Sequence, residues 1–431
     1  MQQRPLNQHA SPPKAGTPPT PIVRAVVMLG ITQIIGWGTT VYALGVLAKP
    51  ITADTGWRLD LVIAGITVAL LASGLVSTKI GRLIDRRGGQ FVMAAGSILV
   101  AWLQVALAFT PNISAYLVIW GLLGIAMRMC LYDAAFAALV QVTRERGRAA
   151  ISYLTLFGSF ASSIFWPIGY ALDEYFGWRT TFLIFAGSNL LICMPLHVWG
   201  LRVRDSVIAT SVAPATGLAI AQTSEAKSFL SGSARAIAMA LFAVVTSACA
   251  FVFGALAVLL PAVLVASGVN AREAVILASI KGVAQFAGRV CDIAFGRNLG
   301  PLTVGRIAVG CLPLSFAALL YGESGFGWAL AFTILFGISN GLLTIVRGAV
   351  PLVLFGPVGY GAVLGLLATP YLLMNATAPV ILAALIERTG FVVGEWLMLA
   401  VGLVAVVAME VMAAWYRRIE RQPPPPQTVD S

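Results

Sequence analysis

The stretch Gly81–Gln90 reads GRLIDRRGGQ and forms a short, strongly charged interruption between two long apolar runs. A related pattern, Gly-Arg-x-x-Asp, recurs at Gly288–Asp292. The apolar runs beside these segments have about the 20 residues that a membrane-spanning helix needs. Two similar charged segments, one in each half of a very apolar chain, indicate a duplicated membrane protein.

The composition excludes an ordinary water-soluble fold. Of the 431 residues, 59% are hydrophobic and 10% are charged, whereas soluble domains average about 25% charged residues. A soluble protein of this size cannot bury so much apolar surface, so we expect a lipid bilayer to surround it. The formal net charge is +11. The basic residues lie between the apolar runs, which favours membrane orientation and argues against a nucleic-acid partner.

Twelve apolar runs are long enough to cross a bilayer. Their approximate limits are 24–48, 61–80, 90–110, 113–140, 148–171, 178–200, 235–265, 272–292, 303–321, 327–354, 359–385 and 391–416. We therefore predict an all-α membrane protein with twelve transmembrane helices in two pseudo-symmetric six-helix halves.

Lysines and arginines predict the orientation, because cytoplasmic segments are enriched in them. With both termini inside, most of them fall in inner segments, and the outer segments hold Lys49, Arg58, Arg179, Arg272 and Arg388. We predict a monomeric, multi-pass protein of the cell inner (plasma) membrane with both termini cytoplasmic. Its predicted parts are a disordered tail 1–23, an N-terminal half 24–200, a cytoplasmic linker 201–234, a C-terminal half 235–416 and a tail 417–431.

The first charged segment matches a known loop signature, G-x-x-x-D-[RK]-x-G-[RK]-[RK]. The matching positions are Gly81, Asp85, Arg86 and Gly88. Gly89 and Gln90 stand where the signature has basic residues, and the second copy at Gly288–Asp292 is weaker. Together with twelve apolar runs and a central linker, these residues resemble the major facilitator superfamily over about 24–416.

The resemblance implies a transporter of small molecules that works by alternating access. It also implies a role for the charged segments, because Asp85 can face the positive N-terminal end of a helix from the other half. Contacts that exist in only one conformation set the balance between states. The residues of this predicted conformational latch are Gly81, Arg82, Asp85, Arg86, Gly88, Arg289 and Asp292. The alternative is a solvated charged loop that only fixes topology.

Within the superfamily, the chain is most similar to the monocarboxylate and oxalate/formate-type porters. The similar features are Gly36-Trp37-Gly38, Gly56-Trp57-Arg58 and a basic residue, Lys281, midway along the eighth run. This resemblance implies an organic anion, such as a monocarboxylate, as the substrate.

Several ionisable side chains lie inside apolar runs, where charges are expensive and usually face a cavity. An anion held between Arg128 of the fourth run and Lys281 of the eighth would be shared by both halves, near the midplane. The candidate substrate-binding residues are Arg128, Lys281, Gln285, Tyr132, Trp37, Gln33, Asn340, Arg347 and Tyr371. For each of them the alternative is a structural role in ion pairs or helix packing.

Asp133 is the candidate for proton coupling, and the alternative is a structural network with the inner loops. Asp133 follows Arg128 by five residues. Asp133 is therefore near enough in sequence to be the structural partner of Arg128, although in a continuous helix this spacing places the two side chains on different faces, which weakens that pairing.

The leading hypothesis is a secondary active transporter of a small organic anion, with protons as a further candidate partner. The alternative is proton-coupled efflux of drugs, metabolites or metalloids, for which Cys130 near Arg128 offers a thiol. A transporter-like sensor is less favoured, because both tails are short and proline-rich. The sequence contains no Ser/His/Asp set and no metal-ligand cluster, so we predict no enzymatic activity, no cofactor and no metal site.

Overall fold

The computed structural model describes residues 20–143, 146–202, 230, 232–296, 299–321 and 325–420. The predicted N-terminal tail, the central linker and the predicted C-terminal tail lie largely outside these residues. The described residues are almost entirely helical, as the apolar runs predict.

Among the described residues, ten helical segments form the N-terminal half. They are α1 (Thr20–Thr39), α2 (Ala43–Thr55), α3 (Leu59–Arg87), α4 (Gly89–Ala108), α5 (Ile113–Cys130), α6 (Tyr132–Thr143), α7 (Gly147–Gly158), α8 (Ala161–Ser188), a short π-helix (Asn189–Cys193) and α9 (Met194–Gly200). The segments of the C-terminal half are α11 (Gly232–Ala266), α12 (Ala271–Phe295), α13 (Pro301–Tyr321), α14 (Phe326–Phe355), α15 (Tyr360–Thr389) and α16 (Phe391–Glu420).

Twelve crossings follow from these segments. By length and hydropathy, the described residues contain 11 candidate membrane spans, of which Gly147–Gly200 is 54 residues long. At about 1.5 Å per residue that span exceeds twice the thickness of a bilayer core of about 30 Å. Within it, Gly177 has the non-helical angles φ 75° and ψ 163°, so the span is two crossings. The predicted twelve-helix fold is confirmed.

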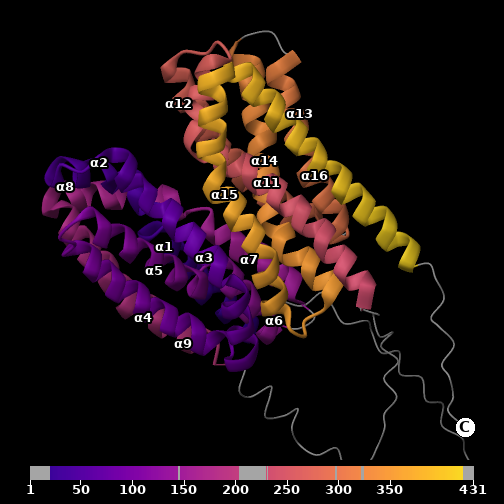
Figure 1. Cartoon of the computed structure of the whole chain (residues 1–431). Helices are drawn as coiled ribbons and strands as arrows, with labels where there is room; N and C mark the ends of the chain where they lie inside the picture. Colours follow the sequence, from indigo (N-terminus) through magenta and orange to yellow (C-terminus); the bar gives the residue numbers. More distant parts are fainter. Residues whose placement is uncertain are drawn as a thin grey trace, which may run out of the picture.

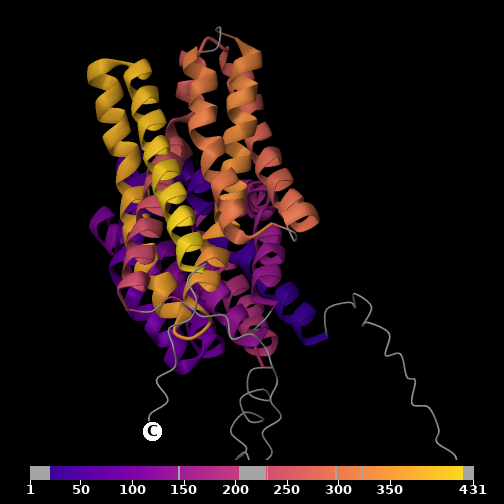
Figure 2. The same ribbon diagram turned by 90° about the vertical axis from the view of Figure 1, so that its right-hand side faces the viewer.

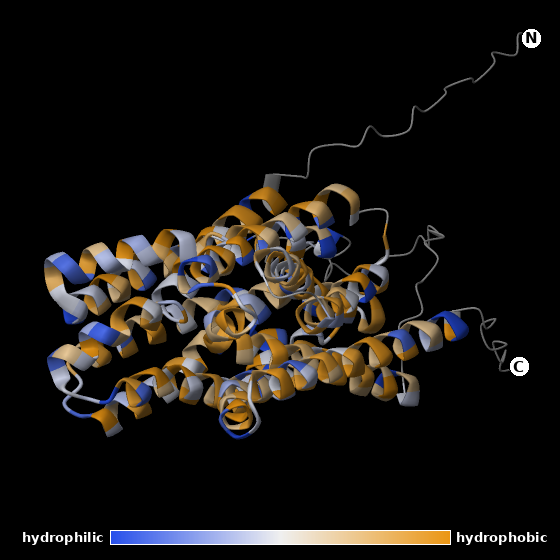
Figure 3. Cartoon of the chain, turned by 90° about the horizontal axis from the view of Figure 1, so that it is seen from above, coloured by the Kyte–Doolittle hydropathy of each residue, from blue (hydrophilic) through white to orange (hydrophobic). Residues whose placement is uncertain are grey.

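The two halves meet at one end of the molecule. Figure 1 shows their helices close together near α6 and α7 and diverging toward α2 and α12. The view turned by 90° in Figure 2 shows the long helices of the C-terminal half running side by side. Hydrophobic residues predominate along the helices in Figure 3. Exposed apolar side chains such as Trp102, 68% exposed, and Val407, 61% exposed, suit a surface that faces lipid.

An apolar cluster of buried side chains joins the two halves. Around α6 it includes buried Phe136 and Leu139, and it continues into the other half through Ile345, Tyr360 and Leu364. In a bilayer the hydrophobic effect does not drive helices together, so close packing of small residues has to hold them.

Helices α3 and α15 show this close packing across the two halves. A Cβ atom added at Gly81 would overlap the carbonyl oxygen of Gly361, and one added at Gly365 would lie 2.5 Å from the carbonyl oxygen of Ser77. The hydroxyl of Thr369 donates to the carbonyl of Gly74 at 3.0 Å. Backbone-to-backbone contact therefore runs along the second half of α3.

Candidate functional site

Asp133 lies between two arginines that come from different halves. Its Oδ2 is 3.2 Å from Nη1 of Arg128, and its Oδ1 is 3.2 Å from Nη2 of Arg347. Arg128 and Asp133 therefore form the ion pair that the five-residue spacing had made less favoured. Helix α5 ends at Cys130, and Leu131 is extended with φ −84° and ψ −168° before α6 begins. Because this break redirects the chain, the five-residue spacing does not set the angle between the two side chains.

Each of these arginines has a second partner. Nε of Arg128 donates to the hydroxyl of Ser77 on α3, and Arg128 is only 5% exposed. The guanidinium of Arg347 lies 3.6 Å from the ring centroid of Tyr371 on α15, which is a cation–π contact. A cavity of about 10 Å³, lined in part by Asp133 and Arg347, adjoins these groups and has room for roughly one water molecule.

Arg289 of α12 forms a second buried bridge between the halves. Its Nη1 donates to the carbonyl of Thr155 at 2.8 Å and to the hydroxyl of Ser159. On the other side, Nη2 donates to the hydroxyl of Thr344 on α14 at 3.3 Å. Among the described residues, this 2%-exposed arginine forms no ion pair with a carboxylate. It was expected at the latch, and it lies deeper, one helical turn before Asp292.

Lys281 lies near the middle of α12 and faces an aromatic ring. Its Nζ is 5.6 Å from the ring centroid of Phe336 on α14. Within the described part of the chain, no carboxylate forms a salt bridge with it. An unpaired cation in a membrane protein is expected to face a cavity or a ligand.

Aromatic and amide groups surround the end of α5. Trp37 lies 5.2 Å from Tyr132 and 6.2 Å from Tyr42, between ring centroids. Nε2 of Gln33 donates to the carbonyl of Cys130 at 2.9 Å. Oε1 of Gln33 and Nε1 of Trp37 are buried and have no hydrogen-bond partner in the described structure, so each has an unused hydrogen-bonding group.

The remaining predicted binding residues are less informative. The side chains of Gln285 and Asn340 are partly buried, and no described hydrogen bond involves them. Sequence reasoning missed the hydroxyl and carbonyl partners of the arginines, which are Ser77, Thr155 and Thr344. Nothing in the sequence distinguishes these residues from the other serines and threonines of apolar runs.

Asp85 joins the end of α3 to the beginning of α15. Its Oδ1 accepts the backbone N–H of Gly361 at 2.9 Å, and its Oδ2 accepts the N–H of Ala362 at 2.7 Å. These N–H groups belong to the first turn of α15, where free backbone donors and the helix dipole favour an anion. We call this end of the molecule, where α3 ends and α15 begins, the Asp85 end.

The second charged segment makes the related contact between α12 and α7. Ser152 donates to Oδ2 of Asp292 at 2.8 Å, and Nη2 of Arg148 lies 3.8 Å from Oδ1. Arg148 also donates to the carbonyls of Gly296 at 2.7 Å and Leu299 at 2.6 Å. In both halves, therefore, the end of the second helix of the half is bound to the other half.

The other residues of the first segment have different surroundings. Arg82 and Arg86 are exposed, and the described ion pairs do not include them. Gly88 ends α3 with φ 85°, and its N–H donates to the carbonyl of Ile84 at 2.8 Å. Since an L-residue rarely adopts this angle, glycine is the residue suited to this position.

Curated relatives match over part of the chain. An uncharacterized MFS-type transporter, YcxA of Bacillus subtilis (strain 168), is 24% identical over 144 residues, which is 33% of this chain and 35% of the relative. A multi-drug resistance efflux pump PmrA homolog of Lactococcus lactis subsp. lactis (strain IL1403) is 30% identical over 134 residues, which is 30% of this chain and 31% of the relative. The matches thus span about a third of these relatives.

Solved structures match over nearly the whole chain. The human organic anion transporter MFSD10 (TETRAN) has a TM-score of 0.67 at 15% identity, over 92% of this chain and all (100%) of the other. The proton:xylose symporter XylE bound to 6-bromo-6-deoxy-D-glucose has a TM-score of 0.66 at 13% identity, over 90% of this chain and 95% of the other. At these identities the likeness shows the fold alone.

A family model supplies the remaining link from fold to family. The model of the Major Facilitator Superfamily matches residues 28–353, which is most of the chain. Since the twelve crossings and the solved structures agree with that match, this multi-pass membrane protein belongs to the Major Facilitator Superfamily of transporters.

Proposed function

We propose that this transporter is a secondary carrier of a small organic anion, such as a monocarboxylate, and that it works by alternating access. The observation that carries the proposal is a group of four cations within apolar helices that has one carboxylate among its described partners. Asp133 alone faces both Arg128 and Arg347. Neither Lys281 nor Arg289 has a carboxylate partner in the described salt bridges. A substrate anion would supply the missing negative charge.

The proposed binding mode uses both kinds of cation. A guanidinium can hold a carboxylate with two parallel hydrogen bonds, whereas an ammonium acts as a point charge. Arg128 belongs to the N-terminal half and Lys281 to the C-terminal half. An anion that contacts both favours conformations in which the halves approach each other around it, and this couples binding to closure. The unpartnered atoms of Gln33 and Trp37 are suited to orient the rest of the substrate.

We propose that Asp133 couples proton movement to this cycle. While it is ionised, it occupies Arg128 and Arg347. When it takes up a proton, the two arginines lose their common counter-charge and can hold the substrate carboxylate instead. Proton and anion would then bind together, which is symport.

The contacts at the Asp85 end support an assignment of the conformational state. The described hydrogen bonds between the halves begin at the Thr369–Gly74 pair and continue toward the Asp85 end, where Asp85 and Asp292 accept theirs. The distribution of lysine and arginine predicts that this end is cytoplasmic. We propose that the structure is the outward-facing state of a plasma-membrane carrier, with both termini in the cytoplasm.

The test is transport by purified protein in liposomes on a solid-supported membrane. Small carboxylates, inorganic oxyanions and cationic drugs are applied in turn to wild type, Lys281→Ala and Lys281→Arg. We expect carboxylate currents that Lys281→Ala reduces by about tenfold or more and that Lys281→Arg partly restores, because the charge is retained. Lys79→Ala changes an exposed lysine and should leave the currents unchanged. Carboxylate currents that survive in Lys281→Ala would remove Lys281 from the site.

A second candidate is proton-driven efflux of drugs or metabolites. It is favoured by the relative described as a multi-drug resistance efflux pump homolog and by the acid at the centre of the network, Asp133. The same panel separates the two candidates. Currents with cationic drugs and none with carboxylates would favour efflux and would contradict an anion substrate.

A further inference from the structure

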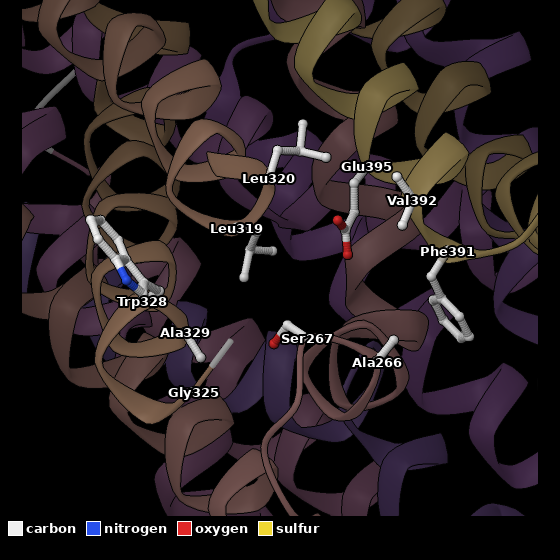
Figure 4. Close-up of a pocket in the computed structure, with 10 residues that line it drawn as sticks. All are labelled: Ala266, Ser267, Leu319, Leu320, Gly325, Trp328, Ala329, Phe391, Val392 and Glu395. Atoms are coloured by element: carbon white, nitrogen blue, oxygen red, sulfur yellow. The ribbon is translucent and has the colours of Figure 1, made fainter. Parts of the chain in front are cut away.

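A pocket of about 230 Å³ lies among four helix ends of the C-terminal half. The helices α11 and α13 end there, and α14 and α16 begin there (Figure 4). Since α15 begins at the Asp85 end and α16 starts directly after α15 ends, the pocket lies at the opposite end of the molecule. None of its lining residues belongs to the charge network between the halves.

Glu395 of α16 places a carboxylate in this pocket. Glu395 is 8% exposed, and its side chain forms no hydrogen bond or ion pair within the described structure. Figure 4 shows the carboxylate pointing into the space in front of Ser267 and Leu319. No lining residue is basic. The carboxylate faces the pocket without a protein donor, so its acceptors are free for a ligand that supplies N–H donors or positive charge.

The second polar group of the pocket is also an acceptor. The hydroxyl of Ser267 donates its proton to the carbonyl of Leu264 at 2.7 Å. Its oxygen lone pairs therefore remain for a donor in the pocket. A carboxylate and a hydroxyl oxygen together suit a group that carries several N–H donors and a positive charge. The lining side chains also include Trp328, whose indole carries one N–H donor.

The walls of the pocket favour a small organic cation. Trp328 and Phe391 lie on opposite sides of it (Figure 4), and aromatic faces attract ammonium groups. The volume is below the roughly 300–1,000 Å³ of pockets for drug-sized ligands. Trp328 is 47% exposed at the start of α14, and tryptophans are enriched where a membrane meets water. The pocket thus lies at a level that lipid headgroups reach.

We propose that this pocket binds an ammonium group through Glu395, with Ser267 as a second acceptor and the aromatic rings as walls. The group is either the headgroup of an aminophospholipid or a small free amine from the aqueous side. Both sources present the same ammonium chemistry. The site is independent of the transported anion.

The experiment measures binding to the purified full-length protein by native mass spectrometry and by thermal unfolding. The probes are phosphatidylethanolamine with phosphatidylglycerol as its anionic comparison, and phenethylamine with phenethyl alcohol as its neutral comparison. Wild type should prefer the ammonium member of at least one pair. Preference for the lipid alone identifies a headgroup site, and preference for phenethylamine alone identifies a site for free amines.

Two variants of one helix locate the binding. Glu395→Gln keeps the shape of the side chain and removes its charge, and we expect binding of the ammonium probe to weaken by about tenfold or more. The matched control is Glu410→Gln, which changes the partner of Arg306 at 2.5 Å outside the pocket and should bind as wild type does. Equal binding by wild type and Glu395→Gln would overturn the proposal. If Glu395→Gln does not fold, the wild-type comparison still decides, because equal binding of phenethylamine and phenethyl alcohol, with no preference between the lipids, contradicts ammonium recognition.

Discussion

Asp133 compensates two buried cations, so its charge matters more than that of any single exposed acid. Removing one member of a buried ion pair leaves its partner uncompensated, at a cost of about 3–5 kcal/mol. Here one carboxylate serves Arg128 and Arg347 together. In the proposed cycle, the charge of Asp133 sets how strongly these arginines attract another anion.

Asp133→Asn tests this role. We expect the variant to lose stimulation by a pH gradient and to retain exchange of substrate in the absence of a gradient, because the amide cannot carry the proton. Thermal stability should fall, since the two arginines lose their counter-charge. Flux and unfolding are measured on the same preparations. Asp60→Asn, which changes an exposed acid paired with Arg58 at 2.6 Å, is the control. Undiminished pH-driven flux in Asp133→Asn would exclude Asp133 as the proton carrier.

The sequence indicated which charged residues matter and did not indicate which of them meet. Arg128, Asp133, Lys281 and Arg347 could be selected because a charge within an apolar run is costly. Their pairing depends on the break at Leu131, and no glycine or proline marks that position. Glu395 was not selected, because a glutamate near the start of a helix resembles an ordinary interfacial residue until its burial is known.

At the scale of elements, the ends of helices hold the two halves together. The carboxylate of Asp85 satisfies two backbone donors that the first turn of α15 leaves free. Asp292, at the end of α12 in the C-terminal half, accepts a hydrogen bond from Ser152 of α7 in the N-terminal half. The first of these contacts could be anticipated from the charged loop and the helix dipole. The identity of the receiving helix depends on a contact across 276 residues, which one sequence does not reveal.

Asp85→Asn should weaken closure of this end. An amide offers one acceptor oxygen in place of two and carries no charge for the helix dipole. We expect a loss of about 1–3 kcal/mol, which changes the ratio of the two conformations by roughly 5- to 150-fold. Transport should slow while substrate binding changes little. Turnover and binding are measured together, with Lys79→Ala, which changes an exposed lysine of α3, as the control. Normal turnover at normal expression would refute the latch.

Gly81→Ala tests the close approach of α3 and α15 without changing any charge. The added methyl group would overlap the carbonyl oxygen of Gly361, so the two helices must separate. We expect slower transport and a less populated closed Asp85 end, measured by thiol accessibility of an introduced cysteine there. Gly187→Ala adds the same methyl group where no atom lies within 4 Å, and it should behave as wild type. Equal accessibility in both variants would show that α3 and α15 do not need this contact.

The positions of the helices were largely predictable, because a run of about twenty apolar residues usually forms a membrane-spanning helix. Their interruptions were not. The spans of α1–α2, α5–α6 and α7–α8 contain breaks that hydropathy cannot detect. Near those breaks, Ser159 accepts a hydrogen bond from Arg289, and Tyr132 packs against Trp37. The candidate site therefore depends on helix breaks that are hard to predict from the sequence.

At the scale of the whole molecule, the contacts between the two halves include a group of arginines with one aspartate, in addition to Asp85 and Asp292. Arg128 and Arg347 share Asp133, Arg289 donates to Thr155 of the other half, and Lys281 faces Phe336 of its own half. The same interface contains the hydrogen bonds that hold the Asp85 end closed. The proposed anion site and the interface that is proposed to move therefore lie in one region, and this is the basis of the proposed coupling between binding and closure.

The most direct test of this account is a pair of distance measurements between spin labels across the two halves. One pair, at Arg86 and Val358, reports the Asp85 end, and the other, at Tyr175 and Val392, reports the opposite end; all four positions are exposed. The labels are placed in full-length protein whose five cysteines have been replaced. We expect a short Arg86–Val358 distance without substrate. When a transported carboxylate is added, the Arg86–Val358 distance should become longer in part of the molecules, and the Tyr175–Val392 distance should become shorter in part of them. Distances that do not change when the carboxylate is added, or that become longer at both ends together, would contradict alternating access around a shared anion site.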